Sequence, residues 1–120
     1  MKKISTVLLL ISSLAAVGCA TVAPGPTGFY WSNYSQTLYD YKKNPNATTL
    51  AKHKANLEKI IHKCDQTPTY KVPPGIYAEL GKIYLDEGKQ DLAARYFNLE
   101  VATYPESAVL VNTLMEKTES

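Results

Sequence analysis

The fold of this chain is decided by residues 73–106, which read PPGIYAELGKIYLDEGKQDLAARYFNLEVATYPE. Two prolines open the stretch, where the first turn of a helix tolerates them. Gly88 suits the left-handed residue that ends a helix, and Pro105 stops the apolar run that follows. The stretch therefore predicts two helices, at 76–87 and 90–103, joined by a tight turn.

The spacing of small and large residues predicts that these two helices pack closely. Small side chains at the crossing leave room for the bulky ones around them. The pattern resembles one tetratricopeptide unit, which has about 34 residues and two antiparallel helices. The positions that match the repeat and are expected to pack it are Tyr77, Leu80, Gly81, Tyr84, Gly88, Ala93, Phe97 and Pro105.

Two positions depart from the repeat pattern. Gln90 stands where an aromatic residue is usual, and Glu100 stands where a small residue is usual. Glu100 predicts that this face of the second helix is less covered than in a long array. The resemblance also implies an inner, partner-binding groove on the first helix, and the residues at those positions are Ala78, Lys82, Leu85 and Asp86.

The flanking sequence predicts three more helices. Asn46 is suited to cap a helix that runs to about Cys64, with an apolar face at Leu50, His53, Leu57, Ile60, Ile61 and Cys64. Lys52, Asn56, Lys59 and Lys63 fall on its opposite side. A short aromatic helix is expected at 33–44, and a last one from Ser107. Because one repeat cannot bury its own faces, the prediction is an all-α, right-handed mini-solenoid of about five helices with no sheet.

The first residues predict export and lipid attachment. Lys2 and Lys3 precede an apolar stretch at 4–17, which is too short for a membrane-spanning helix. It ends in Ala-Val-Gly-Cys, which resembles the bacterial lipobox and implies diacylglycerol on the Cys19 thiol, cleavage before Cys19, and a fatty acyl chain such as palmitate on the new amine. The alternative is an ordinary signal peptide that contains a cysteine. The predicted organisation is a signal peptide at 1–18, a lipidated tether at 19–28 and a helical domain at 29–120.

Charge excludes some classes of protein. The formal net charge of +2 is too small for a dedicated nucleic-acid binder, and two cysteines cannot form a disulfide framework. Residues 19–64 carry six lysines against two acidic residues, and 65–120 carry five basic residues against nine acidic ones. The halves could attract each other or face different partners, or the charges could only be solvated.

No catalytic or metal-binding pattern stands out, so we expect no enzyme activity, no cofactor and no metal. Cys64 lies on an apolar face, where a small buried side chain is the simplest interpretation. The nine tyrosines have two interpretations. They fill the core and its rim, or Tyr30, Trp31 and Tyr34 form a surface that recognises a glycan or a partner loop.

Longer stretches resemble a family of small bacterial lipoproteins that contain the domain of unknown function 4810. They are the lipobox, the aromatic run at 30–41, LEKII, VPPGIYAELG and YPESA. The resemblance implies a helical periplasmic lipoprotein with no assigned activity. Ala20, in place of an aspartate, implies the outer membrane. We therefore expect a non-catalytic outer-membrane lipoprotein that faces the periplasm and helps to assemble an envelope protein complex, which could include other lipoproteins. The alternative is a peptidoglycan-binding or glycan-binding module.

Overall fold

The chain folds into a series of helices with very little other regular structure. The computed structural model describes residues 27–117, so the predicted signal peptide, Cys19 and nearly all of the tether lie outside the described residues. The elements, in order, are β1 (Gly28–Phe29), α1 (Tyr34–Lys43), α2 (Ala47–Gln66), β2 (Tyr70–Lys71), α3 (Ile76–Asp86), α4 (Gln90–Thr103), a 3-10 turn (Pro105–Ser107) and α5 (Ala108–Glu116). The all-α class is confirmed, and the predicted helix bounds hold to about two residues.

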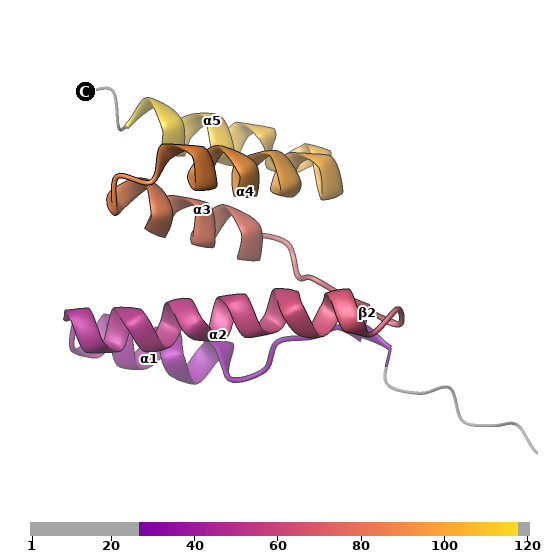
Figure 1. The fold of residues 1–120 in the computed structure, drawn as a ribbon, viewed down its shortest axis with the longest axis horizontal. Helices are drawn as coiled ribbons and strands as arrows, with labels where there is room; N and C mark the ends of the chain where they lie inside the picture. Colours follow the sequence, from indigo (N-terminus) through magenta and orange to yellow (C-terminus); the bar gives the residue numbers. More distant parts are fainter. Residues whose placement is uncertain (1–26, 118–120) are drawn as a thin grey trace, which may run out of the picture.

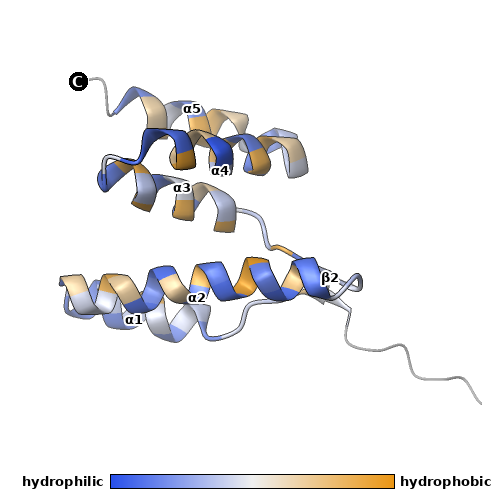
Figure 2. Ribbon diagram, viewed as in Figure 1, coloured by the Kyte–Doolittle hydropathy of each residue, from blue (hydrophilic) through white to orange (hydrophobic). Residues whose placement is uncertain are grey.

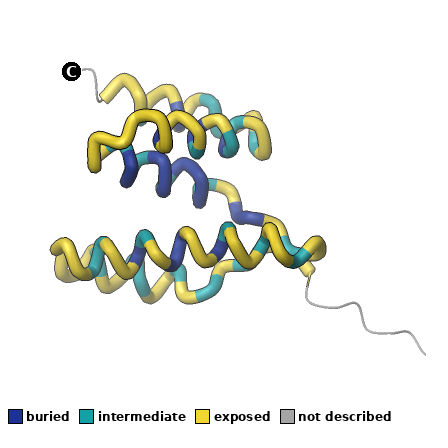
Figure 3. Tube along the Cα trace, viewed as in Figure 1, coloured by how far each residue is buried: buried dark blue, intermediate teal, exposed yellow. Residues whose placement is uncertain are grey.

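The helices stack in sequence order (Figure 1). α1 lies beside α2, and α3, α4 and α5 follow as successive layers. Hydrophobic residues occur along α2, α3, α4 and α5 (Figure 2), and the buried ones form one cluster that joins these helices. Burial is heaviest on α3, which lies in the middle of the stack (Figure 3). Its buried residues are Ile76, Tyr77, Ala78, Leu80, Gly81, Ile83 and Tyr84.

α2 begins where the sequence predicts and buries a wider face than predicted. The Asn46 side chain accepts hydrogen bonds from the backbone N–H groups of Thr48 and Thr49, each at 2.9 Å. His53, Leu57 and Ile60 are buried, as their spacing predicts. The prediction for Asn56 was wrong, because this residue is buried as well. α2 contacts both α1 and α3, so two of its sides are covered.

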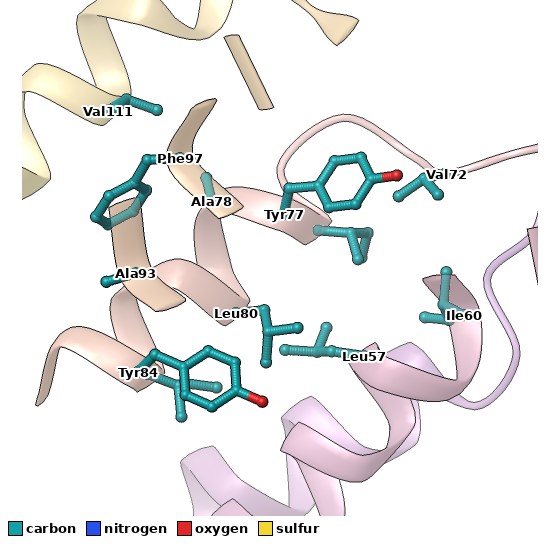
Figure 4. Packing of buried hydrophobic residues seen from close by; sticks show 12 residues of the cluster. Leu57, Ile60, Val72, Tyr77, Ala78, Leu80, Tyr84, Ala93, Phe97 and Val111 are labelled. Carbon is teal, nitrogen blue, oxygen red and sulfur yellow. The ribbon is translucent and has the colours of Figure 1, made fainter. Parts of the chain in front are cut away.

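The α3–α4 hairpin is closely packed at Gly81. A β-carbon added there would lie 2.8 Å from Cδ1 and Cε1 of Phe97 and 3.3 Å from the carbonyl oxygen of Ala93. Leu80 points from α3 toward Leu57 of α2, which joins the hairpin to the next layer (Figure 4). Gly88 has a φ of +77°, the left-handed conformation expected at the end of α3. The contacts with Phe97 and Ala93 therefore leave no space for a β-carbon at position 81.

The prediction that Glu100 lies on a poorly covered face was wrong. This side chain is 0% exposed. Its carboxylate accepts hydrogen bonds from the backbone N–H groups of Gly75 (2.9 Å) and Ala78 (3.3 Å) and from the hydroxyl of Ser107 (2.9 Å). The N-terminus of α3 has no capping side chain of its own, so its free N–H groups and positive dipole end are met by a carboxylate from α4.

A small parallel strand pair is the exception to the predicted absence of a sheet. Gly28 pairs with Tyr70 and Phe29 with Lys71. The N–H of Tyr30 extends the ladder by donating to the carbonyl oxygen of Lys71 at 3.2 Å. Strands of two residues are too short to show an alternating pattern, so the sequence gives no sign of them. Gly28, expected at the end of the tether, is therefore the first residue of β1.

Candidate functional site

A groove runs between the α1–α2 pair and α3, and we call it the α2–α3 groove. Charged side chains of both signs line it, together with an aromatic ring and two aliphatic side chains. The lining residues are Tyr41, Lys42, Leu50, His53, Glu79, Lys82, Ile83, Asp86 and Glu87. All of them lie on α1, α2 or α3 except Glu87, which is the C-cap of α3.

The floor of the groove is a hydrogen-bonded network that joins three helices. His53 of α2 is 1% exposed, and its Nε2 lies 2.6 Å from Oε1 of Glu79 on α3. Its Nδ1 lies 2.8 Å from Oγ1 of Thr37 on α1. The hydroxyl of Tyr34 donates to the second oxygen of Glu79 at 2.8 Å. The network therefore fixes the distances between α1, α2 and α3 with directional bonds.

Both ring nitrogens of His53 are satisfied in either protonation state. In the neutral ring, Nε2–H donates to Glu79 and the Thr37 hydroxyl donates to Nδ1. In the charged ring, Nδ1–H donates to Thr37, whose hydroxyl then donates to the carbonyl oxygen of Tyr34 at 3.1 Å. A buried imidazole with both nitrogens engaged offers no lone pair to a substrate. His53 therefore has a structural role, in which it links α2 to α1 and α3.

The rim of the groove carries paired charges. Lys82 pairs with Asp86 one turn further along α3. Lys54 of α2 donates to Glu87 at 2.8 Å, and Lys89 lies 3.1 Å from the same carboxylate. Hydrogen bonds from these two lysines lower the pKa of Glu87. The rim thus carries donors and acceptors of both charges, paired with one another.

Tyr84 ties the end of α3 to its neighbours. Its ring stacks on Tyr96 of α4 at 5.5 Å, and Nζ of Lys54 lies 4.2 Å from its centroid. Its hydroxyl donates to Glu58 of α2 at 2.8 Å. Burial, aided by this hydrogen bond, raises the pKa of Tyr84 to about 12. Burial and the bond to Glu79 likewise raise the pKa of Tyr34. Both hydroxyls therefore remain protonated donors at neutral pH.

The structure separates the residues predicted to bind a partner. Lys82 and Asp86 line the α2–α3 groove, and Tyr34 bonds to its floor. Ala78 was wrongly predicted to line an open surface, because it is buried and its backbone donates to Glu100. Leu85 packs partly buried against the core, outside the groove lining.

The two remaining aromatic residues lie away from the groove. Tyr30 stacks on Tyr70 with ring centroids 5.1 Å apart, so it belongs to the strand pair. Trp31 leans on Tyr34 at 5.4 Å and stays 45% exposed. Trp31 is therefore in contact with Tyr34, whereas the ring of Tyr30 packs on Tyr70. Tyr34 and Tyr30 make contacts within the fold, and Trp31 is the exposed member of the three.

Sequence reasoning missed the network at the groove floor. One signal was available, because His53 is a polar residue on the apolar face of α2 and needs a partner when buried. Glu79 gives a similar signal, because it is a charged residue between buried apolar positions of α3. Nothing in the sequence indicates that these two residues, 26 positions apart, meet.

A second hollow lies at the β2 end of α2. It is lined by Cys64, Asp65, Tyr70, Lys71, Val72, Tyr77, Thr103 and Tyr104. Burial, reinforced by the charge of Asp65, raises the pKa of Cys64. This thiol is therefore a poor nucleophile at neutral pH, in keeping with a packing role.

Residues 27–117 contain no group of three or more histidine, cysteine, aspartate or glutamate side chains placed to hold a metal ion. Within the same range, no helix combines the length and the apolar character needed to cross a bilayer.

Comparison with known proteins identifies a family and nothing more specific. The family model for a domain of unknown function (DUF4810) matches residues 29–114. No curated protein and no solved structure matches the chain. The matched region runs from the second residue of β1 to Leu114 in α5 and includes every residue that lines the groove. This chain belongs to the DUF4810 family.

Proposed function

We propose that this chain is a non-catalytic lipoprotein of the bacterial outer membrane that faces the periplasm and binds a protein partner through the α2–α3 groove. In this role it would help to assemble or stabilise an envelope complex. The observation that carries the proposal is the groove itself, with a hydrogen-bonded floor and a rim of charges of both signs. Such a surface suits a polar segment of another protein, because complementary charges fix the register of a partner.

The α3–α4 hairpin supports a protein-binding role. Its close crossing, with Phe97 and Ala93 of α4 against Gly81 of α3, is the packing expected of a tetratricopeptide-like unit. In such units the inner face of the first helix contacts the partner. Lys82 and Asp86 lie on that helix and line the groove. The hairpin therefore presents to the groove the same helix that the repeat would use.

The membrane location rests on the N-terminal sequence. A basic start, a short apolar stretch and Ala-Val-Gly-Cys support lipid attachment at Cys19. A single acyl chain holds a protein only marginally, whereas two or three chains hold it firmly. Lipid on both the thiol and the amine of Cys19 would keep the domain at the membrane surface.

The proposal predicts that exchanging the rim charges weakens capture of the partner. Lys82→Glu combined with Asp86→Lys keeps an opposite-charge pair on α3 and reverses its direction. After crosslinking of intact envelopes and affinity purification, we expect recovery of the partner to fall roughly tenfold, which corresponds to about 1.4 kcal/mol. Quantitative mass spectrometry of the captured proteins measures the change.

A matched exchange on α4 provides the control. Asp91 and Arg95 are exposed, lie one turn apart and are absent from the groove lining, so Asp91→Arg with Arg95→Asp should leave recovery unchanged. Recovery of the chain alone from crosslinked membranes in mild detergent would count against the proposal. So would equal recovery of the partner with both exchanged variants.

A further inference from the structure

The segment that joins the predicted lipid attachment site to the helices carries two exposed aromatic side chains. Phe29 is 51% exposed and Trp31 is 45% exposed. Side chains alternate along an extended segment, and Tyr30 between them stacks on Tyr70. Phe29 and Trp31 are therefore left on the outward side, where neither is needed to hold the strand pair together.

Exposed lysines lie on β2 and on the last turns of α2. Phe29 pairs in register with Lys71, and both residues are exposed. The last turns of α2, which contact β2, add the exposed Lys59 and Lys63. Asp65 is the one acidic residue between positions 59 and 71. Glu106 adds a second acidic residue, because it acts on Tyr104, which lines the same hollow as Lys71. Three lysines against two acidic residues still leave an excess of positive charge at this end of the domain.

We propose that Phe29, Trp31 and Lys71 form a bilayer-docking patch that lies in the headgroup region of an anionic membrane. The aromatic rings would sit at the boundary between headgroups and acyl chains, where tryptophan is enriched in membrane proteins. The lysine would meet the negative surface of the membrane. This inference rests on the proposed function, because it requires the lipid on Cys19.

The length of the tether favours a bilayer over other partners. Seven residues lie between Cys19 and Thr27, so the two α-carbons are eight steps apart and at most about 29 Å from each other. β1 follows directly, so the lipid holds Phe29 and Trp31 close to the membrane surface. A short tether gives a high effective concentration, so even a weak surface contact would be occupied. The domain would then sit with its β1 end against the membrane.

Trp31 is the only tryptophan in the chain, so its fluorescence reports on this patch alone. The lipidated protein is placed in vesicles of phosphatidylethanolamine and phosphatidylglycerol, with or without bromine on the upper part of the acyl chains. Brominated lipid should reduce the Trp31 emission by roughly twofold or more, because the ring lies at the interface. Lys71→Glu and Phe29→Ser should each reduce this quenching.

A tryptophan at another exposed position provides the matched control. Tyr39 of α1 is 58% exposed and lies outside the patch. In Trp31→Phe with Tyr39→Trp, the emission should be insensitive to brominated lipid and quenched by aqueous iodide. Circular dichroism of each variant verifies that the helices are retained.

Three outcomes of the vesicle experiment would contradict the docking patch. If the protein floats with the vesicles while Trp31 remains quenched only by iodide, the docking patch is wrong and the lipid anchor stands. If the protein does not float with the vesicles, the anchor and the patch are both wrong. If soluble peptidoglycan fragments shift the Trp31 emission and lipid does not, the patch is a glycan site and the inference is overturned.

Discussion

Replacing Glu100 by alanine is expected to lower the free energy of unfolding by about 3–5 kcal/mol. The carboxylate is fully buried and accepts hydrogen bonds from two backbone N–H groups at the start of α3 and from Ser107. Alanine would leave these donors without an acceptor and open a cavity beside them. Since small domains have a total stability of about 5–15 kcal/mol, this one change should leave the chain close to unfolding.

Urea unfolding followed by circular dichroism measures the effect. Glu100→Gln keeps the size of the side chain and one acceptor oxygen, so it should lose less, about 1.5–3 kcal/mol. Glu106 is exposed, and Glu106→Ala should change the stability by less than about 0.5 kcal/mol. Equal urea midpoints for Glu100→Ala and the unmodified chain would show that the carboxylate does not hold α3.

Replacing Gly81 by leucine is expected to destabilise the chain by about 1–3 kcal/mol through overpacking. Even the first carbon of a side chain would lie 2.8 Å from the ring of Phe97, too close for two carbon atoms. Gly81→Ala meets the same ring, although the better helix propensity of alanine offsets about 1 kcal/mol of the cost. Leucine gains nearly as much helix propensity, but the additional carbons of its side chain must also be accommodated against Phe97.

A double-mutant cycle tests whether Phe97 causes the clash. Phe97→Leu removes the ring, so it should cost less stability in the Gly81→Ala chain than in the unmodified chain. Ala94 is exposed on α4, and Ala94→Leu should leave the melting temperature nearly unchanged. A melting curve that Gly81→Leu does not alter would contradict this crossing of α3 and α4.

The helices could be predicted from the sequence because their signals are local. Asn46, Gly88 and Pro105 act on the backbone within one turn, and all three lie at helix ends in the structure. The pairing of small and large residues at Gly81 and Phe97 is also a local pattern with a fixed spacing. These features need no knowledge of distant contacts.

The errors concern residues whose partners are distant in the sequence. From the sequence alone, Glu100 resembles a solvent-exposed residue. Its partner Gly75, whose N–H donates to the carboxylate, lies 25 positions earlier in the chain. Gly75 has a φ of +93°, so the turn before α3 presents its N–H groups to that carboxylate. The predicted place of Ala78 on an open groove was wrong for the same reason. A buried charge is recognised only when the groups that surround it are known.

The α2–α3 groove also combines residues that local patterns single out with contacts between residues that are distant in the sequence. Lys82 and Asp86 line the α2–α3 groove, and their role in binding a partner stays a prediction. Its floor joins Thr37, His53 and Glu79 from three helices, so it depends on how the layers stack. That stacking is a property of the tertiary structure.

The measurement that tests the account most directly is mass spectrometry of the protein taken from intact membranes. The account predicts a mature chain that begins at Cys19, with diacylglycerol on its thiol and a fatty acyl chain on its amine. Cys19→Ser should abolish incorporation of labelled fatty acid, and Cys64→Ser, which changes the other cysteine, should not. A chain released without lipid, or one cleaved at another residue, would contradict the account.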